Sequence, residues 1–133
     1  MSDGEDPSDI PICVYPAGVS PHFSLYMEDV ESLAVGQEVK GPVVNMYLAI
    51  LRVEMMSVTD MAKLYVFDSG FYQSILEKRT AFLSKSVENA RIFEREMLFL
   101  PICVDKHWFA LCVLKPGAVA GRGSGTTIVV LDR

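Results

Sequence analysis

The sequence has 133 residues, of which 50% are hydrophobic and 22% are charged, and its formal net charge is −5. A chain of this length forms one domain at most, and its hydrophobic content excludes an intrinsically disordered protein. The acidic balance argues against nucleic acid as a partner, and no apolar run approaches the roughly 20 residues that would indicate a membrane protein.

The cysteines and histidines are too few and too scattered to predict a metal site. The chain has three cysteines and two histidines, and no two cysteines have the spacing of metal ligands. An odd number of cysteines indicates a reducing compartment and no disulfide framework. Cys13 lies inside a short apolar run, where we expect a buried, inert thiol.

The amino-terminal residues predict a lead-in, a strand and a loop. Residues 1–9 carry four acids, and we expect them to be disordered. The apolar run 10–15 contains Pro11 and is closed by Pro16, which favours a strand at a sheet edge. Residues 17–21 predict a loop.

Two helices are predicted next. A short helix at 27–33 has acids in its first turn, where they suit the helix dipole, and it ends at Gly36. Apolar residues then recur at helical spacing over 42–56, with a proline at the first helical position. We expect this second helix to be the main helix of the chain.

The following region gives weaker signals. The helical pattern breaks at 57–60, and 64–67 predicts a short extended piece. A polar residue at 68–69 can cap a further helix that reaches Phe82. Residues 83–91 are polar and are left unassigned by the pattern.

A β-hairpin is the most distinct local prediction. Two apolar runs of strand length, 99–104 and 107–114, flank a polar pair at 105–106, and the second run opens with His107. Successive strand residues face opposite ways, so His107 and Trp108 lie on opposite faces. Since both faces of the second run are apolar, we expect it to be a central strand.

A third strand is predicted at 126–131, after a glycine-rich loop at 115–125, and it stops at Asp132. If it pairs antiparallel with strand 107–114, Asp132 returns to the end where His107 begins. An imidazole and a carboxylate at adjacent strand ends form the base and orienting half of a nucleophile, base and acid triad.

Several short motifs carry a family resemblance when they occur in this order. They are Val14-Tyr15-Pro16, the acidic helix 27–33 with Gly36, the helix start 43–51, Ile92-Phe93-Glu94, 98–101, His107-Trp108-Phe109-Ala110 and Val130-Leu131-Asp132. In combination they resemble the Ulp1-type cysteine proteases that process SUMO and related ubiquitin-like proteins. Within that family the chain is most similar to the sentrin-specific branch that trims poly-SUMO chains.

The resemblance implies an α+β, papain-like cysteine protease fold, in which amino-terminal helices precede a mixed or antiparallel sheet with the His-Trp hairpin. It implies that His107 is the general base and that Asp132 fixes the tautomer of His107. Trp108 is expected to line the narrow tunnel through which the modifier's Gly-Gly tail reaches the nucleophile.

The same resemblance implies an isopeptidase that removes SUMO, or a related ubiquitin-like modifier, from lysines. The expected partners are that modifier and its conjugates, no cofactor is required, and the expected location is the nucleus or otherwise the cytoplasm. Residues 10–133 are expected to be a partial protease domain, the amino-terminal half, truncated before the nucleophilic cysteine. In the family that cysteine lies further along, at a helix start, with a glutamine upstream.

Departures from the family pattern leave other readings open. Cys103 and Cys112 lie mid-strand and are not expected to replace the nucleophile, so the 133 residues alone are expected to be inactive. The family's aromatic-Leu-Asn-Asp segment is replaced at 38–41, and Arg133 stands where a small residue is usual. The alternatives are a non-catalytic module that binds a ubiquitin-like protein or another partner, and a truncated reading frame that does not fold alone.

Overall fold

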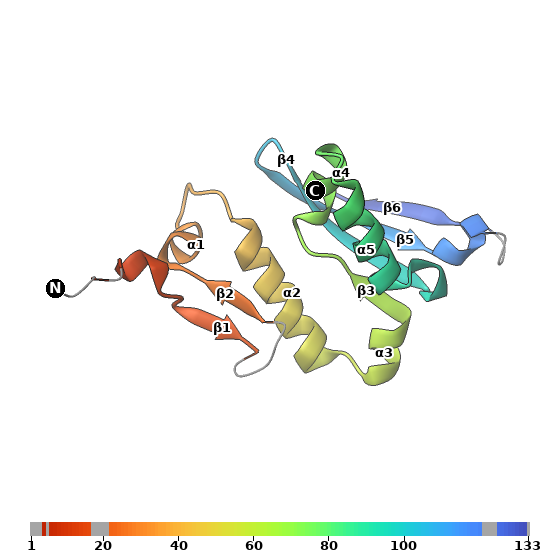
Figure 1. The fold of residues 1–133 in the computed structure, drawn as a ribbon, viewed down its shortest axis with the longest axis horizontal. Helices are drawn as coiled ribbons and strands as arrows, with labels where there is room; N and C mark the ends of the chain where they lie inside the picture. The colour runs from red at the N-terminus through yellow and green to blue at the C-terminus, as the bar shows by residue number, and fades with distance from the viewer. Residues whose placement is uncertain (1–3, 5, 17–21, 121–124, 133) are drawn as a thin grey trace. The chain divides into compact units, whose positions relative to one another are not determined.

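The computed structural model describes residues 4, 6–16, 22–120 and 125–132, and Figure 1 shows its elements. The chain divides into two compact units, Met1–Met55 and Met56–Arg133, and each is described by itself. Among the described residues, no helix is both long enough and apolar enough to cross a membrane.

The first unit pairs a short two-stranded ribbon with a long helix. β1 (Cys13–Tyr15) is antiparallel to β2 (Phe23–Leu25), which confirms the strand predicted within 10–15. α2 (Gly41–Met55) is the predicted main helix, and it packs against β2. The Tyr15 hydroxyl donates a 2.7 Å hydrogen bond to the carboxylate of Glu54 on α2, and this bond raises the pKa of Tyr15. The predicted loop at 17–21 lies outside the described residues.

α1 (Met27–Glu31) is the predicted short helix, and a buried carboxylate fixes its start. Asp29 is 3% exposed and accepts a 2.9 Å hydrogen bond from the backbone N–H of Tyr26. The buried Ser32 hydroxyl donates to the carbonyl of Asp29 and accepts the backbone N–H of Lys40 at 3.2 Å. The end of α1 is thereby tied to the segment that leads into α2.

The structure describes one turn within the segment 1–9, which the sequence predicts to be a disordered lead-in. Pro7–Asp9 form a 3₁₀ turn, η1, and the Asp6 carboxylate accepts the backbone N–H of Ser8 at 3.0 Å. This hydrogen bond lowers the pKa of Asp6. A capping aspartate followed by a proline is enough to fix one turn, although the residues around it are acidic.

The second unit is built on a four-stranded mixed sheet in the order β3-β4-β5-β6. β3 runs parallel to β4, while β4, β5 and β6 are antiparallel neighbours in sequence (Figure 1). The predicted α+β class with a mixed sheet is confirmed, and so is the central position of the His107 strand. The strands are β3 (Leu64–Val66), β4 (Met97–Val104), β5 (His107–Leu114) and β6 (Thr127–Leu131).

Helices α4 (Phe71–Leu76) and α5 (Thr80–Ala90) lie over one face of this sheet (Figure 1). The prediction of a single helix reaching Phe82 is wrong, because the chain turns at Lys78, whose φ is 55°. Residues 83–91, left unassigned from sequence, are mostly helical because Leu83 and Val87, one turn apart, pack on the core. That core consists of Phe67, Phe71, Ala90 and Leu98.

α3 (Val58–Lys63) begins where the sequence predicted only a break in the helical pattern. The Ser57 hydroxyl accepts the backbone N–H of Asp60, and the Asp60 carboxylate accepts the backbone N–H of Ser57, both at 3.1 Å. These reciprocal bonds form a capping box and start a new helix. The bond from the Ser57 backbone lowers the pKa of Asp60.

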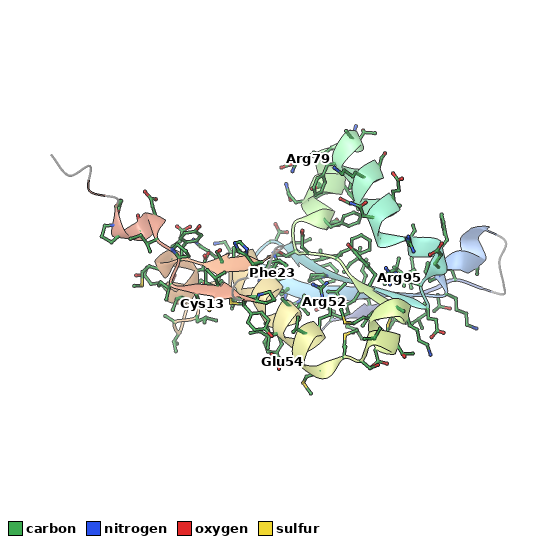
Figure 2. The ribbon with its side chains drawn as sticks, turned by 60° about the horizontal axis from the view of Figure 1, so that its bottom comes forward. Cys13, Phe23, Arg52, Glu54, Arg79 and Arg95 are labelled. Atoms are coloured by element: carbon green, nitrogen blue, oxygen red, sulfur yellow. The ribbon has the colours of Figure 1, made fainter. Side chains whose placement is uncertain are left out.

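The Arg95 side chain connects α3 and the end of α5 to the segment that leads into β4. Its Nη1 donates to the carbonyl oxygens of Met61 and Ala62, and its Nε donates to the carbonyl of Ala90, all at 2.9 Å. The guanidinium also lies 5.3 Å from the ring centroid of Tyr65, and Figure 2 shows where Arg95 lies. This arrangement holds the parallel β3–β4 connection together.

Replacing Arg95 with alanine should lower the free energy of unfolding of the second unit by about 2 kcal/mol, because hydrogen bonds from a charged donor are lost together. Arg91→Ala is the matched control, since the Arg91 side chain forms an exposed ion pair with Glu94 at 3.8 Å. Its loss should change stability by less than about 0.5 kcal/mol. Urea titration followed by circular dichroism measures both. Equal effects of the two substitutions would contradict the role given to Arg95.

Candidate active site

The predicted hairpin is confirmed, and its turn places His107 at the start of β5. Val104 is paired with His107 across the antiparallel strands. The two turn residues, Asp105 and Lys106, both have left-handed backbones with φ of 48° and 68°. Two consecutive residues of this kind form the tight hairpin turn whose twist matches the strands. The register of β4 and β5, and with it the face that His107 occupies, is therefore fixed by the turn.

The structure brings His107 and Asp132 together. Leu131 is paired with Ala110 on β5, so Asp132 follows directly after the last paired residue of β6. The Nε2 atom of His107 lies 2.5 Å from Oδ1 of Asp132, and the two side chains are 52% and 49% exposed. A carboxylate only accepts, so Nε2 carries the shared proton, and the basic nitrogen of the neutral ring is Nδ1.

Trp108 lies on the other face of the sheet from His107, as the strand alternation predicts. It is half-buried and is the cross-strand neighbour of Cys103. Of the predicted site residues, the structure therefore joins His107 with Asp132 and places Trp108 behind them. The tunnel role of Trp108 stays a prediction.

The cysteines of the second unit do not share the face of His107. Cys103 is paired with Trp108, and Cys112 is five positions from His107, so both lie on the opposite face. Cys112 is 8% exposed, and burial raises the pKa of its thiol. Neither cysteine can hydrogen-bond to Nδ1 of His107 from this position.

Cys13, in the first unit, is exposed, so the expectation of a buried thiol is wrong. It is the first residue of a short strand that pairs on one side only, and such a strand leaves part of its side chains open. Its Sγ lies 3.7 Å from Sδ of Met46 on α2.

The three thiols should react at different rates with iodoacetamide at neutral pH. Cys13 and Cys103 are exposed, while Cys112 is buried and its raised pKa keeps it in the unreactive thiol form. We expect Cys112 to react at least about tenfold more slowly than the other two. Peptide mapping by mass spectrometry over a time course measures the rates, with urea as the control that should equalise them. Fast labelling of Cys112 in the folded chain would contradict its placement.

The face of the sheet that carries His107 is only partly covered. Val113, which shares this face, packs against the core under α4 and α5. On β6, the side chains of Ile128 and Val130 lie opposite Val113 and Leu111 and are 63% and 57% exposed. An apolar, open area therefore lies beside the His107–Asp132 pair.

Comparison with known proteins agrees with this geometry. A family model described as "Ulp1 protease family, C-terminal catalytic domain" matches residues 37–132. The chain is 27% identical over 110 residues to sentrin-specific protease 6 of Mus musculus, covering 71% of this chain and 10% of that protein. It is 29% identical over 133 residues to ubiquitin-like-specific protease 1D of Arabidopsis thaliana, covering 91% of this chain and 22% of that protein.

Solved structures give the same fold. A de-sumoylating protease matches 88% of this chain and 47% of its own, with a TM-score of 0.67 and 15% identity. The Ulp1-like SUMO protease catalytic domain of Chaetomium thermophilum matches 82% of this chain and 44% of its own, with a TM-score of 0.57 and 18% identity. The chain thus spans less than half the length of each relative and solved chain described here. Since the family match extends over most of its length, the chain belongs to the Ulp1 protease family.

Proposed function

We propose that this chain supplies the base and the orienting carboxylate of a cysteine isopeptidase that removes SUMO, or a related ubiquitin-like modifier, from lysines. The observation that carries the proposal is the 2.5 Å contact between His107 Nε2 and Asp132 Oδ1. Family membership supports it, because a histidine paired in this way is the activating base of a thiol nucleophile.

In the proposed reaction, Nδ1 of His107 takes the proton of a cysteine thiol, and the thiolate attacks the carbonyl carbon of the modifier's terminal glycine. The C–N bond to the lysine breaks, and the imidazolium gives its proton to the departing amine. Water then hydrolyses the thioester, with His107 acting again as the base. Throughout, Asp132 holds the Nε2–H and stabilises the positive charge on the ring.

We further propose that the nucleophilic thiol comes from residues outside the 133 described by this sequence. The position of Cys103 and Cys112 on the face away from His107 supports this. The exposed Ile128 and Val130 support it as well, because an open apolar area next to a catalytic base is suited to packing against another segment. On this reading the chain is the amino-terminal half of the protease domain.

We also propose that the chain belongs to the branch that trims poly-SUMO chains, which its sequence motifs resemble most; its relatives include a sentrin-specific protease of Mus musculus. Nuclear location is part of the same proposal, and fluorescence microscopy of the tagged protein tests it. Trp108 is proposed to line the path of the modifier's tail. Replacing Trp108 with alanine tests this role, and we expect the substitution to raise KM for a SUMO conjugate.

Hydrolysis of a SUMO–lysine isopeptide by two preparations tests the proposed function. The 133-residue chain should show no turnover, and the longest natural product of the gene should release SUMO. Turnover by the 133-residue chain that disappears on His107→Ala would show that the account of the nucleophile is wrong. No turnover by any natural product would show that the chain is not part of an active protease.

A binding module is the second candidate, and the segment before α2 favours it. Residues 38–41 lack the family's aromatic residue. The backbone N–H of Lys40 bonds to the Ser32 hydroxyl, and the Lys40 side chain forms a 3.5 Å ion pair with Glu28. Titration of labelled SUMO and ubiquitin into the 133-residue chain tests this candidate. Binding without turnover in every natural product favours it, and no binding at high micromolar concentration contradicts it.

A further inference from the structure

Phe109 lies next to both members of the His107–Asp132 pair. It is two positions after His107 on β5, so the two side chains share a face. Their ring centroids are 6.3 Å apart and the ring planes differ by 23°, which is a stacked arrangement. The alternation of residues along β5 would identify Phe109 as a neighbour of His107, but only the register of β6 reveals its relation to Asp132.

The strand register puts Phe109 on the face of the sheet that carries the His107–Asp132 pair, at the end of the β5–β6 pairing. Ala110 is paired with Leu131, and continuing this antiparallel register by one residue sets Phe109 opposite Asp132. Asp132 therefore reaches His107 diagonally, past the side chain of Phe109. Diagonal neighbours in a sheet lie about 7–8 Å apart, which is within reach of aromatic and long side chains.

On the side away from β6, Phe109 is paired with a buried residue of β4. Its cross-strand partner on β4 is Ile102, which is 1% exposed and is the most buried large side chain among the described residues. Phe109 is half-buried, whereas His107 is 52% exposed. A half-buried ring, paired across the strands with a buried residue, therefore stacks beside a side chain that is half exposed.

We infer that Phe109 is a positioning residue that forms the floor of the His107–Asp132 hydrogen bond. Its ring restricts rotation of the imidazole about χ2 and keeps water from the underside of the Nε2–H···Oδ1 contact. Excluding water strengthens such a bond, because the local dielectric constant falls. This inference rests on the proposed function, in which the bond orients the general base.

The rate at which the His107 Nε2 proton exchanges with water tests this inference. The measurement does not need the catalytic cysteine. The experiment is a ¹H,¹⁵N NMR measurement on the 133-residue chain with ¹⁵N-labelled histidine, and His22→Ala assigns the signals because the chain has two histidines. Phe109→Ala should speed exchange about tenfold or more, since the bond becomes open to solvent. Phe109→Tyr keeps the ring and should restore the wild-type rate.

Leu111→Ala is the matched control, because Leu111 shares the face of Phe109 but lies opposite Val130 and away from the pair. It should leave the exchange rate of the imidazole unchanged. If Phe109→Ala disrupts the β5 amide signals, Phe109→Leu is used as the test variant instead. Leucine fills space but cannot stack on the imidazole. An intact sheet with faster exchange then supports the inference.

Wild-type exchange rates in Phe109→Ala and Phe109→Leu would overturn the inference, as would a wild-type signal already lost to rapid exchange. Asp132→Ala separates this failure from failure of the proposed function. If Asp132→Ala leaves the protected signal in place, the pair itself does not form, and the proposed base loses its support. If Asp132→Ala removes the signal while the Phe109 variants do not, only the role of Phe109 is wrong.

Discussion

Replacing His107 with alanine in the longest natural product should reduce hydrolysis of a SUMO conjugate by about 1,000-fold or more. The imidazole is the group that generates the thiolate and protonates the leaving amine, and its Nε2 is already engaged by Asp132 at 2.5 Å. Without it, the thiol stays protonated near neutral pH and the amine leaves poorly. The value of kcat/KM for a fluorogenic SUMO substrate measures the loss.

His22→Ala is the matched control for this prediction. His22 is the other histidine of the chain, belongs to the first unit and is exposed. Its removal should leave kcat/KM within about twofold of the wild type. Retention of most of the activity in His107→Ala, or a comparable loss in His22→Ala, would show that His107 is not the general base.

Replacing Asp132 with alanine should lower kcat by about 100-fold or more while KM changes little. Asp132 contacts the imidazole and is not proposed to contact the substrate, so its loss acts on the chemical step. Asp132→Asn should recover part of the rate, because its amide oxygen can still accept the Nε2–H. Steady-state kinetics on the three proteins measures this order.

Asp105→Asn provides the comparison for loss of a nearby carboxylate. Asp105 lies in the turn next to His107 with φ of 48°, a conformation that asparagine adopts readily. Its substitution should preserve kcat, since the turn and the register remain. A loss of kcat as large as that of Asp132→Ala would mean that general charge near the hairpin, and not the paired carboxylate, supports the base.

The meeting of His107 and Asp132 could be predicted from sequence because each step depends on short-range patterns. The polar pair between two apolar runs indicates the hairpin, and strand alternation assigns the face of His107. The β-branched run ending at Asp132 then needs only to pair antiparallel with its neighbour. Consecutive strands usually pair in this way, and here they do.

The helices of the second unit were harder to predict. The break between α4 and α5 depends on the left-handed backbone of Lys78, a conformation for which the residue type gives no signal. α3 could have been found, because Ser57 and Asp60 have the spacing of a capping box. The exposure of Cys13 depends on which segments cover β1, and composition does not encode this.

The position of Phe109 next to the pair illustrates a further limit. The sequence places it on the face of His107 but cannot say which residue of β6 lies opposite it. One residue of slippage would turn Asp132 to the other face of the sheet. The site therefore depends on the register between β5 and β6, which is a tertiary property.

The most direct test of the account is to identify the nucleophile by covalent capture. SUMO carrying a C-terminal vinyl sulfone would be reacted with the longest natural product, and the modified cysteine mapped by mass spectrometry. We expect a single labelled cysteine outside these 133 residues, with labelling lost in His107→Ala. Labelling of Cys13, Cys103 or Cys112, or labelling that persists without His107, would contradict this expectation.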